Sequence, residues 1–348
     1  MLTVQRLMFV LSGEHPTLPA AEATAAIQAE HRAYRVVEQL GQVLIAETKA
    51  DPKSLASRLA MCRGICSHLC TSNATEEEIL ESISSSDVVD LIPHGKSFAV
   101  HIKRVKKSAP NIDTIGLSKK IAELIGSEIE FKVDLTHPDV ELLGVLTGEQ
   151  CVLGITIARV DRSQFKRRRP SRRPVFHPST LPADLARCMV NLARTPRNGT
   201  LVDPFCGVGG ILIEGGLIGA KIIGIDIERE MIEGTRRNLE AHGIREFQLM
   251  VGDARKLPAV EADSIVTDPP YGRQATTAGA TLENLYREAL PSMAEILKQR
   301  GYLCITSPAE LELEELASAS GFRIIERHEQ RVHRSLTRRI YVFRRKKG

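Results

Sequence analysis

The second half of the chain alternates short apolar runs with helical patterns, and this alternation restricts the possible folds more than any other feature. The runs that we expect to be buried strands are residues 200–203, 221–226, 247–251, 264–267 and 302–306. Helical patterns start at Val208 and Arg229, between the first of these runs. Such alternation predicts an α/β fold, with a mainly parallel sheet and helices on both faces. Ligands of these sheets bind outside the carboxyl ends of the strands.

The bulk composition describes an ordinary globular protein. The 348 residues are 43% hydrophobic and 26% charged, which allows two or three domains and argues against general disorder. The seven cysteines are odd in number and scattered, so we expect a reducing compartment rather than a disulfide framework. The start of the chain lacks a signal-peptide pattern, and the most apolar stretch, 201–227, is interrupted by charges. We therefore expect a cytoplasmic protein without membrane association.

Three of the cysteines, Cys62, Cys66 and Cys70, recur at intervals of four residues. We expect a helix over residues 53–71 that carries them on one stripe. Zinc ligands come in closely spaced pairs from two elements, and no second pair matches this one. We interpret the cysteines as small buried apolar residues and expect no metal site.

The first half mixes strand and helix patterns without regular alternation, and a basic, proline-containing segment separates it from the second half. We expect boundaries that give the segments 1–52, 53–160, 161–178 and 179–348. The stretch 159–173 contains eight Lys or Arg against one Asp, which favours contact with a polyanion over a solvated linker. The arginines that we expect to bind RNA are Arg167, Arg168, Arg169, Arg172 and Arg173. The basic run 344–347 is interpreted as a frayed tail.

A glycine-rich turn follows the first predicted strand of the second half. It opens with Asp203 and continues to Gly210, so a ligand can approach its backbone closely. A nicotinamide fingerprint would need glycine at position 212, where Leu212 stands, and Asp203 would repel a pyrophosphate. An acid before the glycines suits a cation, and S-adenosylmethionine carries an ammonium and a sulfonium but no phosphate.

Two further acids end the next strands. Asp226 can accept hydrogen bonds from ribose hydroxyls, and Asp253 can accept one from an adenine amine. Each acid alone is also compatible with a helix cap, but the ordered set favours a bound adenosylmethionine over a nicotinamide site or a structural layer. The candidate cofactor residues are Asp203, Pro204, Phe205, Cys206, Gly207, Gly209, Asp226, Ile227, Asp253, Ala254 and Asp268.

A fourth acid begins a short motif after the run 264–267. The four residues of this motif are Asp268, Pro269, Pro270 and Tyr271. The prolines stiffen the turn, the carboxylate can accept hydrogen bonds from an amine, and the ring can stack on a base. Alone the motif is either a plain turn or a clamp for a planar base with an exocyclic amine.

With the ordered acids in place, the region 179–348 resembles the class I adenosylmethionine-dependent methyltransferases, which have a Rossmann-like fold. The motif at 268–271 is similar to that of enzymes acting on exocyclic base nitrogens. Residues 53–160 resemble a THUMP domain with an N-terminal ferredoxin-like companion in 1–52. The stretches 173–178, 185–187, 191–193, 268–273 and 335–338 resemble tRNA guanine N2-methyltransferases that modify position 10.

This resemblance implies methyl transfer from S-adenosylmethionine to N2 of a tRNA guanosine, once or twice. Asp268 and the carbonyl of Pro269 would orient the amine, and Tyr271 would stack on the base after it leaves its stack. His177 and Pro178 would border the cofactor, although a structural role for His177 fits equally well. We expect a monomer, and the sequence leaves the need for a small activating subunit open.

Three other functions remain compatible with these motifs. One is methylation of another tRNA guanine, and one is adenine N6-methylation, because the same clamp fits that amine. The third is an RNA-binding protein with an inactive Rossmann-like domain. An inactive domain of this kind predicts loss of Gly207, Gly209 or Asp268, and all three residues are present.

Overall fold

The structure is a computed structural model that describes residues 3–270, 282–333 and 336–347. The chain forms two compact units. Unit 1 comprises residues 1–14, 31–57 and 62–161, and unit 2 comprises residues 15–30, 58–61 and 162–348. The two units are defined by compactness and do not test the four segment boundaries expected from the sequence. Those boundaries stay a prediction.

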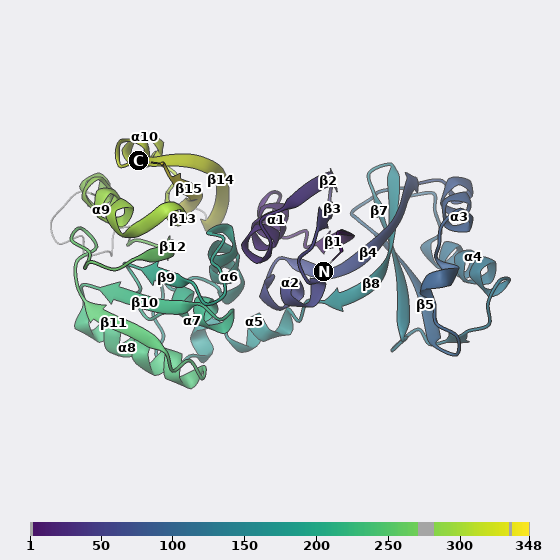
Figure 1. Ribbon diagram of the computed structural model, residues 1–348, viewed down its shortest axis with the longest axis horizontal. Coiled ribbons are helices and arrows are strands. Elements are labelled where there is room, and N and C mark those ends of the chain that lie inside the picture. The colour runs from purple at the N-terminus through teal and green to yellow at the C-terminus, as the bar shows by residue number, and fades with distance from the viewer. Residues whose placement is uncertain (1–2, 271–281, 334–335, 348) are drawn as a thin grey trace. The chain divides into compact units, whose positions relative to one another are not determined.

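Unit 1 is built on an eight-stranded mixed sheet with the order β2-β3-β1-β4-β8-β7-β5-β6. Its strands are β1 (Gln5–Leu11), β2 (Tyr34–Leu40), β3 (Val43–Thr48), β4 (Cys62–Asn73), β5 (Ser97–Arg104), β6 (Lys132–Val133), β7 (Val140–Thr147) and β8 (Gln150–Arg159). Its helical elements are α2 (Pro52–Arg58), α3 (Glu76–Ser84), η1 (Val89–Leu91) and α4 (Thr114–Gly126). Helices α3 and α4 pack together beside β5 in Figure 1 and bury an aliphatic core.

The helix predicted over 53–71 is wrong in its second half, because β4 begins at Cys62. A spacing of four residues fits one face of a helix, but it is also even and therefore fits one face of a strand. Cys62 and Cys66 are buried, and Cys70 is half-buried. Burial raises the pKa of Cys66 to about 11, so its thiol stays protonated at neutral pH. The described residues contain no group of three His, Cys, Asp or Glu arranged as metal ligands.

Unit 2 contains a seven-stranded sheet with the order β11-β10-β9-β12-β13-β15-β14 (Figure 1). Its strands are β9 (Thr200–Asp203), β10 (Lys221–Asp226), β11 (Phe247–Val251), β12 (Ala262–Thr267), β13 (Leu297–Pro308), β14 (Phe322–His333) and β15 (Leu336–Arg345). Strands β9 to β13 are parallel, and β15 pairs antiparallel with both β13 and β14. The predicted α/β fold with a mainly parallel sheet is confirmed.

Both faces of this sheet are covered, because successive strand residues point to opposite sides. On β9, Leu201 packs into one core and Val202 into the other. The helices of unit 2 are α1 (Leu18–Glu30), α5 (Ser163–Arg167), α6 (Ala183–Leu192), α7 (Gly210–Leu217), α8 (Arg229–Ala241), α9 (Leu282–Ile296) and α10 (Glu314–Ala319). Helices α1, α6, α7 and α8 contribute to the core of Leu201, and α9 and α10 to that of Val202. No helix in the described part of the chain is long and apolar enough to span a membrane.

Helix α1 belongs to unit 2 although it lies near the start of the chain. It packs on α6, and the buried carboxylate of Glu22 accepts hydrogen bonds from the backbone N–H groups of Ala60 and Met61. The Asn191 side chain of α6 donates to the same carboxylate, with 2.8 Å between Nδ2 and Oε1. These contacts join three separate segments of the chain in one unit.

Two basic stretches are more ordered than the sequence indicated. Residues 161–178 form α5 and the 3-10 turn η2 (Pro170–Arg172), with Phe165 buried, so this segment is folded against unit 2. The frayed tail predicted at 344–347 is wrong for its first residues, because Arg344 and Arg345 lie in β15. The guanidinium of Arg344 lies 5.3 Å from the ring centre of Tyr302, and Arg345 donates to the Leu297 carbonyl.

Candidate active site

The strand order of unit 2 reverses between β9 and β12, and this reversal is the expected place for a ligand. Strand β9 ends at Asp203, and β12 ends one residue before Asp268. Thr267 donates to the Asp203 carboxylate, with 2.7 Å between Oγ1 and Oδ1. Two of the acids predicted from the sequence therefore lie at the switch point of the sheet.

Asp203 is fully buried, and burial raises the pKa of this carboxyl to about 7. Its neighbours Asp226 and Asp268 push the pKa further up, because each is a like charge. Three acids that converge on one edge create a site with excess negative charge. A bound cation would relieve this repulsion, which fits the ammonium and sulfonium of the predicted cofactor.

The glycine-rich turn after β9 is held by backbone hydrogen bonds and by Asp226. Gly207 N–H donates to Asp226 Oδ2 at 2.8 Å, and Cys206 N–H donates to the Ile225 carbonyl at 3.0 Å. Gly207 has a φ of +51°, and a Cβ placed on it would meet nothing within 4 Å. Open space beside a glycine in the left-handed region leaves room for a ligand to touch the backbone. This fits the predicted cofactor position.

The other predicted cofactor residues have different surroundings. Asp226 accepts the N–H groups of Gly207 and Glu228 on separate oxygens, which leaves a lone pair on each oxygen for a ribose hydroxyl. The next residue, Ile227, is exposed and offers an apolar surface to a ring. Pro204 and Cys206 are buried within the turn, and Phe205 is half-buried against the neighbouring core.

Asp253 forms an ion pair with Arg255, a residue that was not predicted from the sequence. Arg255 Nη2 lies 2.6 Å from Asp253 Oδ2, and Arg255 Nε bonds to both carboxylate oxygens. This guanidinium lowers the pKa of Asp253. An adenine amine would share the carboxylate with Arg255. The buried Ala254 follows directly, as expected for the floor of a ring site.

Side chains from strands β13 and β15 contact the carboxylate of Asp268. Thr306, near the end of β13, donates a short hydrogen bond from Oγ1 to Oδ1 of Asp268. Arg338 of β15 places Nη1 3.7 Å from Oδ2 of Asp268. Pro269 is buried and Pro270 half-buried, whereas Tyr271 lies outside the described residues. A polar residue at the carboxyl end of a predicted strand could have indicated Thr306.

His177 lies on the surface at the turn before α6. Its Nδ1 atom is 2.7 Å from Ser179 Oγ, and its carbonyl accepts the N–H of Thr180 at 3.0 Å. These bonds stabilise the turn, which is compatible with a structural role for His177. A contact of His177 with the cofactor stays a prediction. The described structure places no acid of the strand ends against this ring.

The five predicted RNA-binding arginines divide into two groups. Arg167, Arg169 and Arg172 are exposed, and their role stays a prediction. The prediction is wrong for Arg168 and Arg173, whose guanidinium groups point into the protein. Arg168 forms a two-point ion pair with the buried Glu214, at 3.0 and 2.9 Å, and Arg173 is 6% exposed. Charge density along a sequence cannot tell these two groups apart.

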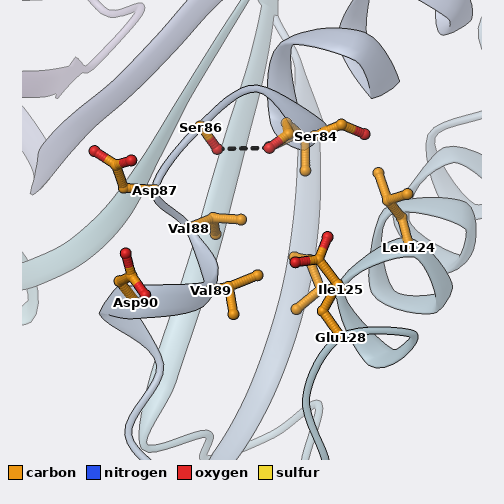
Figure 2. A pocket seen from close by; sticks show the side chains of 10 residues that line it. Ser84, Ser86, Asp87, Val88, Val89, Asp90, Leu124, Ile125 and Glu128 are labelled. Carbon is orange, nitrogen blue, oxygen red and sulfur yellow. Dashed lines mark hydrogen bonds between the residues drawn. The ribbon is translucent and has the colours of Figure 1, made fainter.

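A separate cavity of about 180 Å³ lies in unit 1, between the region of η1 and α4 (Figure 2). Three acids, Asp87, Asp90 and Glu128, line it together with Ser84 and Ser86. Their negative charge would repel RNA phosphate, so this cavity is unsuited to a nucleic-acid backbone.

Known protein families match both halves of the chain. Residues 73–156 match the model of the THUMP domain, and residues 170–340 match the model described as RMKL-like, methyltransferase domain. A tRNA (guanine(10)-N2)-dimethyltransferase of Methanothermobacter thermautotrophicus is 39% identical over 342 residues, which cover 97% of this chain and 99% of the relative. The chain belongs to the family of tRNA (guanine(10)-N2)-dimethyltransferases. The resemblance stated from the sequence motifs is thereby confirmed.

Further comparisons agree with this family. A tRNA (guanine(10)-N2)-dimethyltransferase of Methanocaldococcus jannaschii is 30% identical and covers 97% of this chain and 99% of its own. TrmN from Thermus thermophilus superimposes with a TM-score of 0.52 at 19% identity, over 98% of this chain and 99% of that chain. SMU.472 complexed with SAH superimposes with a TM-score of 0.53 at 17% identity over the whole of both chains. These structures share the fold.

Proposed function

We propose that this protein transfers methyl groups from S-adenosylmethionine to the exocyclic N2 of guanosine 10 in tRNA, giving first the monomethylated and then the dimethylated base. The observation that carries the proposal is the position of Asp268, which lies at the switch point beside Asp203 and is held by Thr306 and Arg338. Family membership supports the choice of base, position and product.

Asp268 acts mainly by orienting the amine. The N2 lone pair is conjugated into the guanine ring, so it must be turned toward the methyl carbon. A hydrogen bond from N2–H to the carboxylate, and a second to the Pro269 carbonyl, favour that geometry. Thr306 and Arg338 hold the carboxylate in place, so its position is set before the base arrives. Holding both reactants in a productive geometry can lower a barrier by about 7 to 11 kcal/mol in total, and orienting the amine supplies one part of this.

The remaining strand ends fit the cofactor. When bound, S-adenosylmethionine supplies a methyl group activated by its sulfonium. Asp203 faces the positive charges of the methionine end, Gly207 offers open backbone, and Asp226 offers acceptors for the ribose hydroxyls. Ile227 and Ala254 provide apolar contacts for the adenine.

In the proposed function, the THUMP domain binds tRNA together with the exposed arginines Arg167, Arg169 and Arg172. Exposed guanidinium groups bind phosphates and release counterions, which adds affinity without reading sequence. A monomer, an undecided activating subunit and a cytoplasmic location stay predictions from the sequence.

The product on a defined substrate tests the function. An unmodified tRNA transcript is incubated with the protein and S-adenosylmethionine, and its nucleosides are identified by mass spectrometry. We expect N2-methylguanosine early and N2,N2-dimethylguanosine late, with no product on a transcript carrying adenosine at position 10. Methylation that persists on this control would indicate another guanine, and N6-methyladenosine would indicate the adenine alternative.

A further inference from the structure

Three guanidinium groups surround one buried carboxylate beside helix α7. Glu214 of α7 is fully buried and pairs with Arg168, and its Oε2 atom lies 2.9 Å from Nη2 of Arg187. Arg173 is the third cation, and the nearby charge of Glu214 acts on it electrostatically. Glu214 is therefore the carboxylate that these three cations share, and Arg187 also interacts electrostatically with Glu22.

Arg173 is the member of this group without a carboxylate at hydrogen-bond distance. Its Nε atom donates to the Arg168 carbonyl at 3.2 Å, whereas Nη1 and Nη2 have no hydrogen-bond partner among the described residues. The side chain is buried, and burial lowers the pKa of this guanidinium. Because an uncompensated buried cation costs free energy, an anion that reaches these nitrogens gains a strong interaction.

The Nη1 atom of Arg173 lies at the start of α7, where the glycine-rich turn ends. A Cβ placed on Gly210, the first residue of α7, would lie 3.1 Å from Nη1 of Arg173 and 3.0 Å from Cγ2 of Thr180. Both distances are shorter than ordinary van der Waals contact, so a side chain at this position would require the guanidinium and Thr180 to shift slightly. The first N–H groups of a helix also attract negative charge, so the helix end and the guanidinium favour the same kind of ligand.

The position indicates which anion binds. A tRNA phosphate is part of a bulky polymer, so it would have to displace far more of the surrounding chain than the terminal carboxylate of a small ligand to meet these nitrogens. The cofactor site begins at the other end of the same turn, where Asp203, Asp226 and Asp268 suit positive charges. The methionine end of S-adenosylmethionine is a zwitterion, so it carries a carboxylate close to its ammonium. We infer that Arg173 binds this carboxylate at the N-terminus of α7, an inference that rests on the proposed function.

A comparison of two ligands by calorimetry tests the inference. S-adenosylhomocysteine carries the carboxylate, and its decarboxylated analogue keeps the adenosine, sulfur and amine. The unaltered protein should bind S-adenosylhomocysteine about 10- to 100-fold more tightly than the analogue, as expected for a hydrogen-bonded charge pair. In Arg173→Met this preference should vanish while affinity for the analogue is kept. Arg173→Lys should restore part of it, and Arg237→Met, at an exposed position of α8, should change neither affinity.

Other outcomes separate the inference from the function. Equal affinity of the unaltered protein for the two ligands would overturn the role of Arg173 and leave the proposed function standing. So would an equal loss of affinity for both ligands in Arg173→Met with a lowered melting temperature, because that pattern describes packing. If the unaltered protein binds neither ligand, the proposed function is wrong and the inference falls with it.

Discussion

The Nη1 atom of Arg338 lies 3.7 Å from the Oδ2 atom of Asp268; Arg338 belongs to the antiparallel strand β15, whereas Asp268 directly follows the parallel strand β12. Both side chains are largely buried. A guanidinium at this distance favours the ionised carboxylate, which is the form that accepts hydrogen bonds from an amine. The antiparallel edge of the sheet thus supplies the positive charge for an acid at its parallel centre.

Removing this cation should make catalysis sensitive to acid. In Arg338→Gln a proton competes better for Asp268, which also lies near the like charge of Asp203, so the acid limb of the pH–rate profile should move to higher pH. On that acid limb we expect the rate to fall about 10-fold at a given pH, as for a shift of one pH unit. Arg338→Lys should move the limb back. A uniform loss of rate at every pH would indicate a structural role instead.

The orienting role of Asp268 predicts a separation of binding from catalysis. Asp268→Ala should slow methyl transfer by about 100-fold, because the amine loses its direction. Affinity for S-adenosylhomocysteine should stay within a few-fold of the original, since the glycine turn is intact. Single-turnover assays with labelled methyl groups and calorimetry measure the two quantities. Near-normal turnover would contradict the clamp.

Cofactor binding should depend on pH through Asp203. Its raised pKa, about 7, leaves the carboxyl partly protonated at neutral pH, and a cationic ligand prefers the ionised form. Affinity for S-adenosylhomocysteine should therefore increase as the pH rises through about 7, with release of a proton. Calorimetry in buffers of different ionisation enthalpy detects this proton. Asp203→Asn should bind weakly and without the pH dependence.

The same group makes an opposite contribution to the stability of the free protein. A folded-state pKa above the unfolded value favours folding at low pH, and this contribution is lost as the pH rises from about 4 to about 7. The difference in free energy of unfolding between the unaltered protein and Asp203→Asn should follow that window. A difference that does not vary with pH would mean that Asp203 is ionised throughout.

Glu214 should be one of the most sensitive positions for folding. Glu214→Gln leaves the buried cations Arg168 and Arg187 without their counter-ion, and loss of one partner of a buried pair costs about 3 to 5 kcal/mol. The matched control is Glu233→Gln, whose partner Arg236 is exposed on α8, and there we expect less than about 0.5 kcal/mol. Urea unfolding measures both changes, and equal effects would contradict the argument.

The affinity for tRNA should depend on the exposed arginines of the basic segment. Charge reversal of Arg167, Arg169 and Arg172 together should lower tRNA affinity and reduce the slope of log affinity against log salt by about one for each lost phosphate contact. The control reverses three other exposed arginines of unit 2: Arg229, Arg237 and Arg245. An unchanged slope in the first variant would show that these arginines do not contact phosphate.

The sequence predicts the parallel part of unit 2 well, because strand ends carry their own signals. Asp203, Asp226 and Asp268 each follow an apolar run, and the carboxyl ends of parallel strands meet at one edge. Arg338 had no such signal, since its position beside Asp268 depends on the antiparallel register between β13 and β15. Spacing alone also failed at Cys62 and Cys66, where an interval of four residues fits both a helix and a strand.

The burial of Arg168 and Arg173 could not be predicted for a different reason. Their compensating charge, Glu214, lies more than forty positions away in an otherwise apolar helix. A local window shows only a run of arginines. Long-range pairing decides which of them face the solvent.

The place of helix α1 has a consequence for how the protein is made. The helix is synthesised among the first residues, but its partner α6 follows much later, and Asn191 lies 169 positions after Glu22. Contacts this distant in sequence close late and slow folding. The catalytic unit therefore cannot be completed by its own contiguous segment, and a fragment starting at residue 162 would expose an apolar groove on α6. During translation, α1 can therefore complete its packing only after the methyltransferase segment that contains α6 has also been synthesised.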